Sequence, residues 1–418
     1  MTTPTAAQAE GSPAGNGPAT TRAIAQGRLT VLRAARLFDG ISSTLILDPV
    51  VVLEGSRIYS VRSGTSAPDG AAVIDLADAT LLPGLIDTHV HLAFDASADP
   101  VNSLAHRQDG EVTQAMVRAG RAALRGGVTT IRDLGDRGYL SLGLRGRTEL
   151  PTIVAAGPPI TTPGGHCHYL GGAVAPTIRD IRAAVREHAA RGVDVIKIMA
   201  SGGNLTPGSR QDLAQFPPEV LRVAVEEAHR LGLPVTAHAH GTGAIADAVA
   251  ADADGLEHVS FWTEHGVDAP VQLMRLIAER HIIVGATVGM VPLPGMTPPP
   301  ELAKRLPGIM ANTRRLHEAG ALMVAGTDAG IAPVKPHDVV RHAPAMLRQL
   351  GFGQAEALRA ITSVAAGVCG LAHCKGRIAA GFDADILAVD GNPITDPDAL
   401  HRVRAVYARG AAVPGAGA

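Results

Sequence analysis

The alternation of apolar and polar positions predicts a parallel α/β fold for most of the chain. Between residues 84 and 371, short apolar runs typical of β-strands alternate with helix-length stretches, and this order is typical of repeated βα units. Helical patterns cover 112–125, 178–190, 218–231 and 301–318. The strand-like runs read LIDTHVHL, VTTIRDL, PTIVAAG, VDVIKIMA, PVTAHAH, GLEHVSF, IIVGAT and ALMVAGTDAG.

Eight such units in about 290 residues predict a (β/α)8 TIM barrel. A doubly wound sheet would need a G-x-G-x-x-G turn after its first strand, and none follows LIDTHVHL. The segments 27–83 and 372–413 have a different texture, with short β-rich runs separated by Gly, Asp and Asn. They predict one small β-sandwich domain built from both termini, with the barrel inserted between its halves. Residues 1–26 have no period and predict a disordered tail.

Composition narrows the function classes. Hydrophobic residues make up 46% of the 418 positions and the mean hydropathy is +0.16, which is enough for a large buried core. Aromatic residues make up only 3%, and 37 Lys and Arg face 39 Asp and Glu, so nucleic acid is not an expected partner. Three cysteines, no signal-peptide pattern and no long apolar stretch predict a cytoplasmic protein that binds no membrane. A small molecule or dipeptide is the expected partner, and homo-oligomerisation stays open.

Histidines at the predicted strand ends suggest a metal site. His89 and His91 close the first run, and side chains two residues apart on a strand point to the same face. Active sites of barrels lie at the carboxyl ends of the strands, where imidazoles can converge on a metal. A single histidine there is more often a core residue, but the joint placement is hard to obtain by chance. The candidate ligands at strand ends are His89, His91, His238, His258 and Asp328, and His240 repeats the two-residue spacing beside His238.

Lys197 interrupts the apolar run VDVIKIMA. Burial lowers the pKa of a lysine, and two interpretations stay open from the residues alone. The amine either forms a structural salt bridge or, beside metal ligands, takes up carbon dioxide to give a carbamate that bridges two cations. The ligand set suffices for two divalent ions, with zinc favoured over manganese or cobalt. Two such ions would share a hydroxide as nucleophile.

The ordered motifs resemble the amidohydrolase superfamily, from PGLIDTHVH through Lys197 and the late histidines to AAGFDADILAVDGNP. More narrowly, the chain resembles imidazolonepropionase-like enzymes and metal-dependent Xaa-Pro or Xaa-Arg dipeptidases, from about residue 29 to 413. The resemblance implies that Asp328 passes a proton from the bridging hydroxide to the leaving amine. It also implies that His89, His91 and Asp328 bind the more buried metal, that His238 and His258 bind the more exposed one, and that carbamylated Lys197 bridges the two.

Two departures from other branches sharpen this expectation. Gly241, Thr242 and Gly243 follow His240, where mononuclear deaminases of the superfamily carry a catalytic Glu. A carbamate lysine on the fourth strand is also not a feature of true imidazolonepropionases, so Lys197 favours the binuclear peptidase-like members.

The substrate contacts are less sharply predicted. The loop TTPGGHCHYLGG, after the third predicted strand, either binds substrate or only satisfies its own backbone. Arg210 either pairs with a substrate carboxylate or is a solvated surface residue. The candidate substrate-binding residues are His166, His168, Tyr169, Ser201, Gly202, Arg210 and His240.

The sequence therefore predicts a binuclear metal-dependent hydrolase. Its expected reaction is cleavage of an amide bond in a small carboxylate-bearing substrate, such as an Xaa-Pro dipeptide or an N-acyl amino acid, by a metal-bridging hydroxide. Two alternatives stay open, namely a cyclic amide or lactone hydrolase and a barrel that binds metal without turnover.

Overall fold

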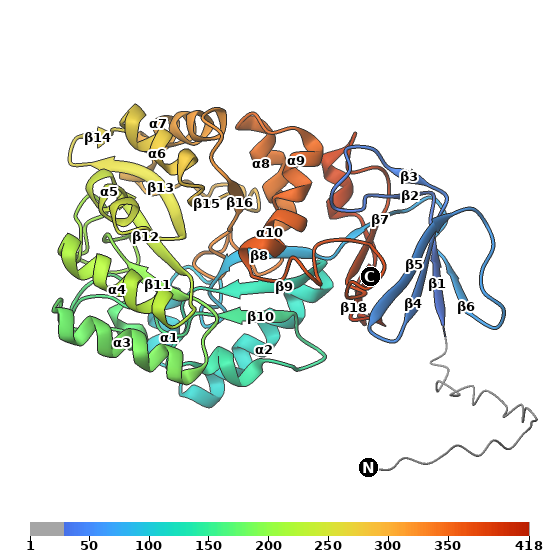
Figure 1. Ribbon diagram of the computed structural model, residues 1–418, viewed down its shortest axis with the longest axis horizontal. Coiled ribbons are helices and arrows are strands. Elements are labelled where there is room, and N and C mark those ends of the chain that lie inside the picture. The colour runs from blue at the N-terminus through green and yellow to red at the C-terminus, as the bar shows by residue number, and fades with distance from the viewer. Residues whose placement is uncertain (1–28, 418) are drawn as a thin grey trace, which may run out of the picture.

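The computed structural model describes residues 29–417 (Figure 1). The predicted tail at 1–26 and the first two residues of the segment 27–83 lie outside the described residues. The larger part of the molecule contains strands surrounded by helices, and the smaller part consists of sheets (Figure 1). Among the described residues, no helix combines the length and the apolar character needed to cross a bilayer.

Eight parallel strands form the centre of the larger part. They belong to two sheets, β10-β9-β8 and β11-β12-β13-β15-β16. An isolated parallel bridge at Ile160–Ile198 joins the β10 edge to the β11 edge, and another at Val90–Ala329 joins the β8 edge to the β16 edge. The strands therefore close into a ring, and the predicted α/β fold is confirmed. The strands are β8 (Leu85–Val90), β9 (Val128–Asp133), β10 (Thr152–Ala155), β11 (Ile196–Met199), β12 (Val235–Gly241), β13 (Gly255–Thr263), β15 (Ile283–Ala286) and β16 (Met323–Ala325).

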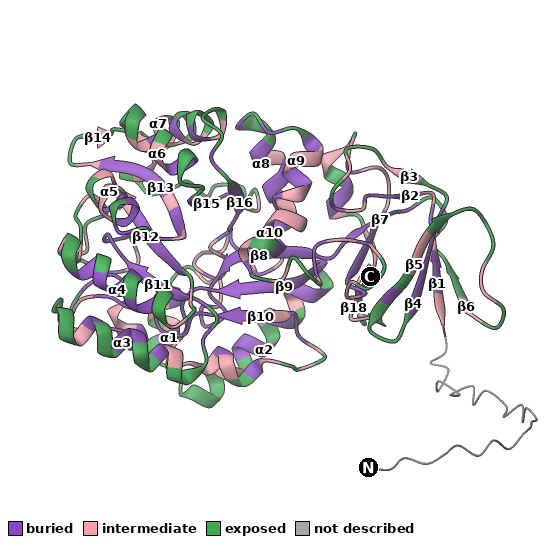
Figure 2. Ribbon diagram, in the orientation of Figure 1, coloured by how far each residue is buried: buried purple, intermediate pink, exposed green. Residues whose placement is uncertain are grey.

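Helices surround these strands, with buried faces inward and exposed faces outward (Figure 2). In α3 the buried residues Ile181, Ala184 and Val185 follow the helical period. Thr177 caps the start of α3, and Gly192 ends it in the left-handed region, with φ 80°. The helices are α1 (Pro100–Ala105), α2 (Asp109–Arg125), α3 (Ile178–Arg191), α4 (Pro218–Arg230), α5 (Thr242–Ala250), α6 (Val271–Glu279), α7 (Pro300–Glu318), α8 (Ala343–Gln349), α9 (Gln354–Arg359) and α10 (Ser363–Val368), with short 3-10 turns η1 (Leu140–Leu144), η2 (His168–Leu170), η3 (Val339–His342) and η4 (Pro397–His401).

The smaller part consists of two sheets, with strand orders β5-β4-β1-β6 and β19-β18-β17-β7-β2-β3. The second sheet combines strands from both ends of the chain, because β7 pairs with β17 in antiparallel register. A short hairpin strand, β14 (Gly266–Val267), pairs with β13. The strands of the two sheets are β1 (Thr30–Arg33), β2 (Arg36–Leu37), β3 (Ile46–Leu47), β4 (Pro49–Glu54), β5 (Arg57–Ser63), β6 (Ala72–Asp75), β7 (Thr80–Pro83), β17 (Ile386–Val389), β18 (Val403–Ala408) and β19 (Ala411–Ala412).

Strands β7 and β17 contribute to two hydrophobic cores. Leu81 and Ile386 pack in the cluster between the two sheets of the smaller part. Their neighbours Leu82 and Leu387 pack in the large cluster that fills the barrel and its helices. Because successive side chains of a strand point to opposite faces, the β7–β17 ladder contributes to both cores and joins the two parts of the molecule.

Candidate metal centre

The predicted ligands come from strands far apart in the sequence and meet at the carboxyl ends of the barrel strands. His89 lies within β8 and His91 directly after it, and Asp328 follows β16 by three residues. The backbone N–H of Asp328 donates to the carbonyl of His89 at 2.8 Å. Asp328 has a positive φ of 61°, which turns the chain away from the strand at this point.

A first group of ligand atoms comes from His89, His91 and Asp328, and these atoms all lie within 4.8 Å of one another. The Nε2 atom of His91 lies 3.1 Å from Oδ1 of Asp328, and Nε2 of His89 lies 3.7 Å from the same oxygen. This group matches the set that the resemblance assigns to the more buried metal.

A second group comes from His238, His240 and His258, again within 4.8 Å. The ring centroids of His238 and His258 are 4.6 Å apart, and those of His240 and His258 are 4.4 Å apart. The sequence placed His240 among the substrate contacts, whereas the geometry places its ring nitrogen with the ligand atoms of the other two histidines. His240 is therefore a candidate third ligand of this group.

Each of these five imidazoles has one ring nitrogen near a protein group outside the centre. Such outer partners orient metal-binding histidines and fix the position of the ring proton. The outer contacts are His91 Nδ1 to the Gly135 carbonyl (2.9 Å), His89 Nδ1 to Glu257 Oε2 (3.1 Å), His258 Nδ1 to Thr287 Oγ1 (2.7 Å), His240 Nδ1 to Ser260 Oγ (2.5 Å) and His238 Nε2 to the Gly202 carbonyl (3.0 Å).

The contact between His91 and Asp328 requires a positive charge. A carbonyl only accepts hydrogen bonds, so Nδ1 of His91 must carry a proton to donate to Gly135. The Nε2 atom of a neutral ring would then present a lone pair to the Asp328 carboxylate, and two acceptors would face each other at 3.1 Å. Either a proton on Nε2 or a cation near both atoms resolves this conflict. The site is therefore suited to a cation.

The charge balance of these groups supports this interpretation. Burial lowers the pKa of His91, but the hydrogen bond and charge of Asp328 outweigh burial and raise it above its usual value. Burial raises the pKa of Asp328, but His89 and His91 outweigh burial and hold it well below its usual range. Asp328 is therefore an ionised carboxylate at neutral pH.

The Lys197 amine is buried, with 1% of the residue exposed, and its Nζ atom has no hydrogen-bond partner among the described residues. Burial lowers the pKa of Lys197 to about 8, against the opposing effects of Glu257 and Asp328. Lys197 lies in register with Thr236 of β12, two residues before His238, and its charge lowers the pKa values of His89 and His238. A buried donor without a partner is costly, so this position suits an amine that is modified or contacts a bound ligand.

Only part of the predicted substrate-binding set contacts the ligand groups. The ring centroid of His166 lies 4.7 Å from that of His238, and the Ser201 hydroxyl accepts from the backbone N–H of His240 at 2.9 Å. In contrast, Nδ1 of His168 lies 2.9 Å from the carbonyl of Gly165 within its own turn. The Tyr169 hydroxyl donates to the Leu205 carbonyl at 3.4 Å.

Arg210 already has a carboxylate partner. Its Nε and Nη2 atoms donate to the two oxygens of Asp212, at 3.1 and 2.5 Å. A Cβ atom on Gly202 would lie 2.3 Å from the carbonyl oxygen of Arg210, so a glycine at 202 allows this loop to fold back onto β11. A substrate carboxylate would have to compete with Asp212 for the guanidinium.

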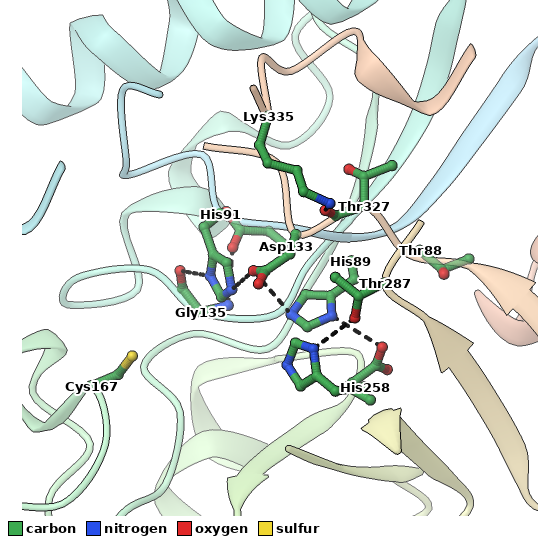
Figure 3. Close-up of polar contacts among 12 residues, drawn as sticks. Thr88, His89, His91, Asp133, Gly135, Cys167, His258, Thr287, Thr327 and Lys335 are labelled. Atoms are coloured by element: carbon green, nitrogen blue, oxygen red, sulfur yellow. Dashed lines mark hydrogen bonds and ion pairs between the residues drawn. The ribbon is translucent and has the colours of Figure 1, made fainter. Parts of the chain in front are cut away.

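Sequence reasoning missed several buried charged residues around the centre. Arg132 and Glu257 lie in the apolar runs VTTIRDL and GLEHVSF and are 5% and 1% exposed. A charge inside a predicted barrel strand is the same signal that singled out Lys197, so both residues could have been found. Lys335 is also buried, and its Nζ donates to the Thr327 carbonyl at 2.8 Å (Figure 3). Lys335 lies in a loop without periodicity, which gives no such signal.

Comparison with known proteins assigns this barrel, with its two groups of candidate metal ligands, to a family of hydrolases. The model of the Amidohydrolase family matches residues 80–413. The chain belongs to the amidohydrolase family and is a hydrolase, and the resemblance expected from its motifs is confirmed.

Relatives come from the branch that the motifs indicated. The chain is 26% identical to ochratoxinase of Aspergillus niger over 91% of its own length and 85% of the relative's length. It is 26% identical to imidazolonepropionase of Micrococcus luteus, over 85% and 90% of the two chains. A solved Xaa-Pro dipeptidase with methionine bound in its active site is 27% identical, with a TM-score of 0.80 over 92% of this chain and 99% of that one.

Proposed function

We propose that the protein is a binuclear metal-dependent hydrolase of amide bonds in small carboxylate-bearing substrates, of the Xaa-Pro dipeptide or N-acyl amino acid type. The buried Lys197 amine, which has no hydrogen-bond partner among the described residues, carries this proposal together with the two groups of candidate ligand atoms. The similarity to an Xaa-Pro dipeptidase supports the substrate class. Lys197 also distinguishes the proposal from an imidazolonepropionase-like reaction, for which a carbamate lysine is not expected.

The proposed cofactors are two divalent ions, with zinc favoured. When bound, the ions would polarise the scissile carbonyl and lower the pKa of a bound water. His89, His91 and Asp328 would hold one ion, and His238 and His258 would hold the other, with His240 as a further candidate. The imidazole and carboxylate atoms of these residues fit such ions, and their outer contacts hold the rings in place.

Lys197 would hold both ions as its carbamate. The neutral amine attacks carbon dioxide, a C–N bond forms, one C–O π pair moves to oxygen, and one proton leaves for solvent. A pKa of about 8 leaves part of the amine neutral near physiological pH. The resulting anion supplies two oxygen atoms where the free amine has no partner.

Asp328 is the proposed acid and base. As an ionised carboxylate it can accept a proton from the attacking water. Water adds its oxygen to the amide carbon, the C–N bond breaks, and Asp328 returns the proton to the departing nitrogen. The products are a carboxylic acid, which passes its proton to the amine or to solvent, and an amine, and Asp328 ends in its starting state.

Substitution of Lys197 by alanine tests the proposal. We expect Lys197→Ala to lose metal and hydrolysis of dipeptides or N-acyl amino acids together, by about 100-fold or more in rate. Added formate, acetate or bicarbonate should restore part of both, because these anions can occupy the position of the carbamate. Metal content by elemental analysis and rates on a panel of dipeptides, N-acyl amino acids, lactams and lactones give the readout.

The matched control is Lys375→Ala. Lys375 is also buried, but it pairs with Asp383 and Asp385 at 2.7 and 2.6 Å. Asp385 directly precedes β17 of the smaller part. This variant should lose stability and keep its metal stoichiometry. Unchanged metal content and rate in Lys197→Ala would contradict the bridging role. Silence of the two-metal protein on every amide of the panel would contradict the substrate class.

A further inference from the structure

We propose that Glu257 is a positioning residue for His89, and that Arg132 and Thr236 hold it in that role. The inference rests on the proposed function, because it takes His89 as a metal ligand. Glu257 lies on β13, directly before His258, and its side chain points across the barrel to β8 and β9. It would fix the ring orientation and the proton position of His89 without touching a metal or substrate itself.

The contact between Glu257 and His89 is isolated from other polar groups. Oε2 of Glu257 lies 3.1 Å from Nδ1 of His89, and both side chains are 1% exposed. The contact falls outside hydrogen-bond geometry, and neither atom has a hydrogen-bond partner among the described residues. The interaction between the two groups is therefore electrostatic, and removal of the carboxylate would leave the buried Nδ1 atom without this 3.1 Å contact.

The other carboxylate oxygen of Glu257 is held by two donors. Nη2 of Arg132 and Oγ1 of Thr236 each donate to Oε1 at 2.8 Å. Nε of Arg132 also donates to the carbonyl of Thr88 at 2.6 Å. Because Thr88 directly precedes His89, Arg132 ties the carboxylate to the strand that carries the imidazole. The guanidinium stays charged in proteins, and it keeps an ionised carboxylate beside it.

Two glycines on neighbouring strands leave the space for this pair. A Cβ atom on Gly285 would lie 2.0 Å from Oε2 of Glu257, and one on Gly326 would lie 2.6 Å from Cβ of His89. The β15 and β16 walls thus approach both side chains closely. A larger residue at either position would therefore displace one of these two side chains or the strand that carries it.

This geometry decides which nitrogen of His89 carries the proton. An ionised carboxylate can only accept a proton, so its position 3.1 Å from Nδ1 favours the tautomer of a neutral His89 that carries the proton on Nδ1. The Nε2 lone pair then points toward Oδ1 of Asp328, 3.7 Å away, where a cation would be bound. Loss of an outer partner of this kind costs about 10- to 100-fold in metal affinity.

The variant Glu257→Gln separates positioning from a purely structural role. Glutamine keeps the size of the side chain. If its carbonyl oxygen accepts from Arg132, its NH2 group faces the Nδ1–H group of His89, and two donors then face each other. We expect the dissociation constant of the first Zn²⁺, measured by chelator competition, to rise about 10- to 100-fold. Glu257→Asp keeps the charge and should recover part of that loss.

Glu227→Gln is the matched control. Glu227 is 6% exposed and accepts from Arg186 and Arg230 at 2.7 and 2.6 Å on the outer surface of α4. This variant also removes a carboxylate held by arginine, so it should lose stability to a similar extent and bind Zn²⁺ as the unmodified protein does. Equal losses of Zn²⁺ affinity in the two variants would overturn the inference.

The tautomer of His89 gives a second readout that needs no variant to fold. Long-range ¹H–¹⁵N correlation spectra of the unmodified protein, with His89 assigned by substitution, should show a proton on Nδ1. A proton on Nε2 alone, or Glu257→Gln that binds two Zn²⁺ as tightly as the unmodified protein, would overturn the role of Glu257 and leave the proposed function intact. An unmodified protein that binds no divalent ion would overturn the proposed function itself.

Discussion

At the residue scale, small side chains decide where the buried charges can lie. Glu257 occupies a space that exists only because β15 carries a glycine at position 285, and a Cβ atom on Gly326 would lie 2.6 Å from Cβ of His89. Neither glycine has a positive φ, so backbone conformation does not require them. Their role is steric, because each lets a polar side chain approach the barrel wall.

Substitution of Gly285 by alanine should therefore displace Glu257 and disturb the candidate metal centre. The new Cβ would lie 2.0 Å from Oε2 of Glu257, and the forced shift should destabilise the protein by about 1–3 kcal/mol and weaken divalent metal binding. Gly243→Ala is the control, since it lies in α5 with nothing within 4 Å of its Cβ. This control should be neutral or more stable by up to about 1 kcal/mol. Thermal unfolding and Zn²⁺ titration of both variants give the comparison, and a Gly285→Ala variant with normal metal affinity would contradict the steric role.

The candidate ligands were predictable from residue type and position, and their surroundings were not. His89, His91 and Lys197 follow from strand ends and from a charge in an apolar run. Thr287, which contacts the ligand His258, directly follows β15 and is 29 residues away in the sequence. No local pattern links such a partner to its ligand. The left-handed backbone of His258 and Asp328, with φ of 75° and 61°, was also hidden, since neither residue type demands it.

At the element scale, periodicity located the long elements and missed the short ones. Each of the eight strand-like runs contains one barrel strand, and α2, α3, α4 and α7 lie where helical patterns predicted them. The six-residue helices α9 and α10 and the turn η4 went unassigned. Fewer than two turns carry too few buried positions to show a period, and such elements are fixed by tertiary packing.

The two short turns η3 and η4 form a contact that should depend on pH. The rings of His342 in η3 and His401 in η4 have centroids 4.1 Å apart. Burial lowers the pKa of His342 to about 4, and the charges of His401 and Arg341 add to this effect. Burial also lowers the pKa of His401, and the charges of Arg341 and Arg402 add to it. Asp338 and Asp398 oppose these shifts for both rings.

The sign of the pH dependence follows from these shifts. An unfolded histidine binds a proton near pH 6.5, while the folded pair resists protonation, so the unfolded state binds more protons below neutral pH. The free energy of unfolding should therefore fall as pH decreases from 7 to 4.5. His401→Gln should make that slope shallower, and His265→Gln, at an exposed position, should leave it unchanged. Urea unfolding at several pH values measures the slopes, and equal slopes in all three proteins would contradict the contact's contribution.

At the scale of the whole molecule, the ladder of β7 and β17 joins the two parts of the fold. Ile386 faces the core of the smaller part, and its neighbour Leu387 faces the barrel core. Strand β7 runs directly into β8, which carries His89. A change in the smaller part should therefore reach the barrel through shared backbone rather than through a flexible linker.

Ile386→Ala tests this coupling, because its side chain packs only in the smaller part while the protein's single tryptophan, Trp262, lies in the barrel. Loss of a buried isoleucine should cost about 2–5 kcal/mol. If the two parts unfold together, the denaturation midpoint from Trp262 fluorescence will fall as far as the midpoint from far-UV circular dichroism. Ile41→Ala, at a residue 45% exposed, should change the free energy of unfolding from either signal by no more than about 0.5 kcal/mol. An unchanged Trp262 midpoint in Ile386→Ala, beside an early loss of circular dichroism, would instead mean that the smaller part unfolds alone and that the barrel holds its site without it.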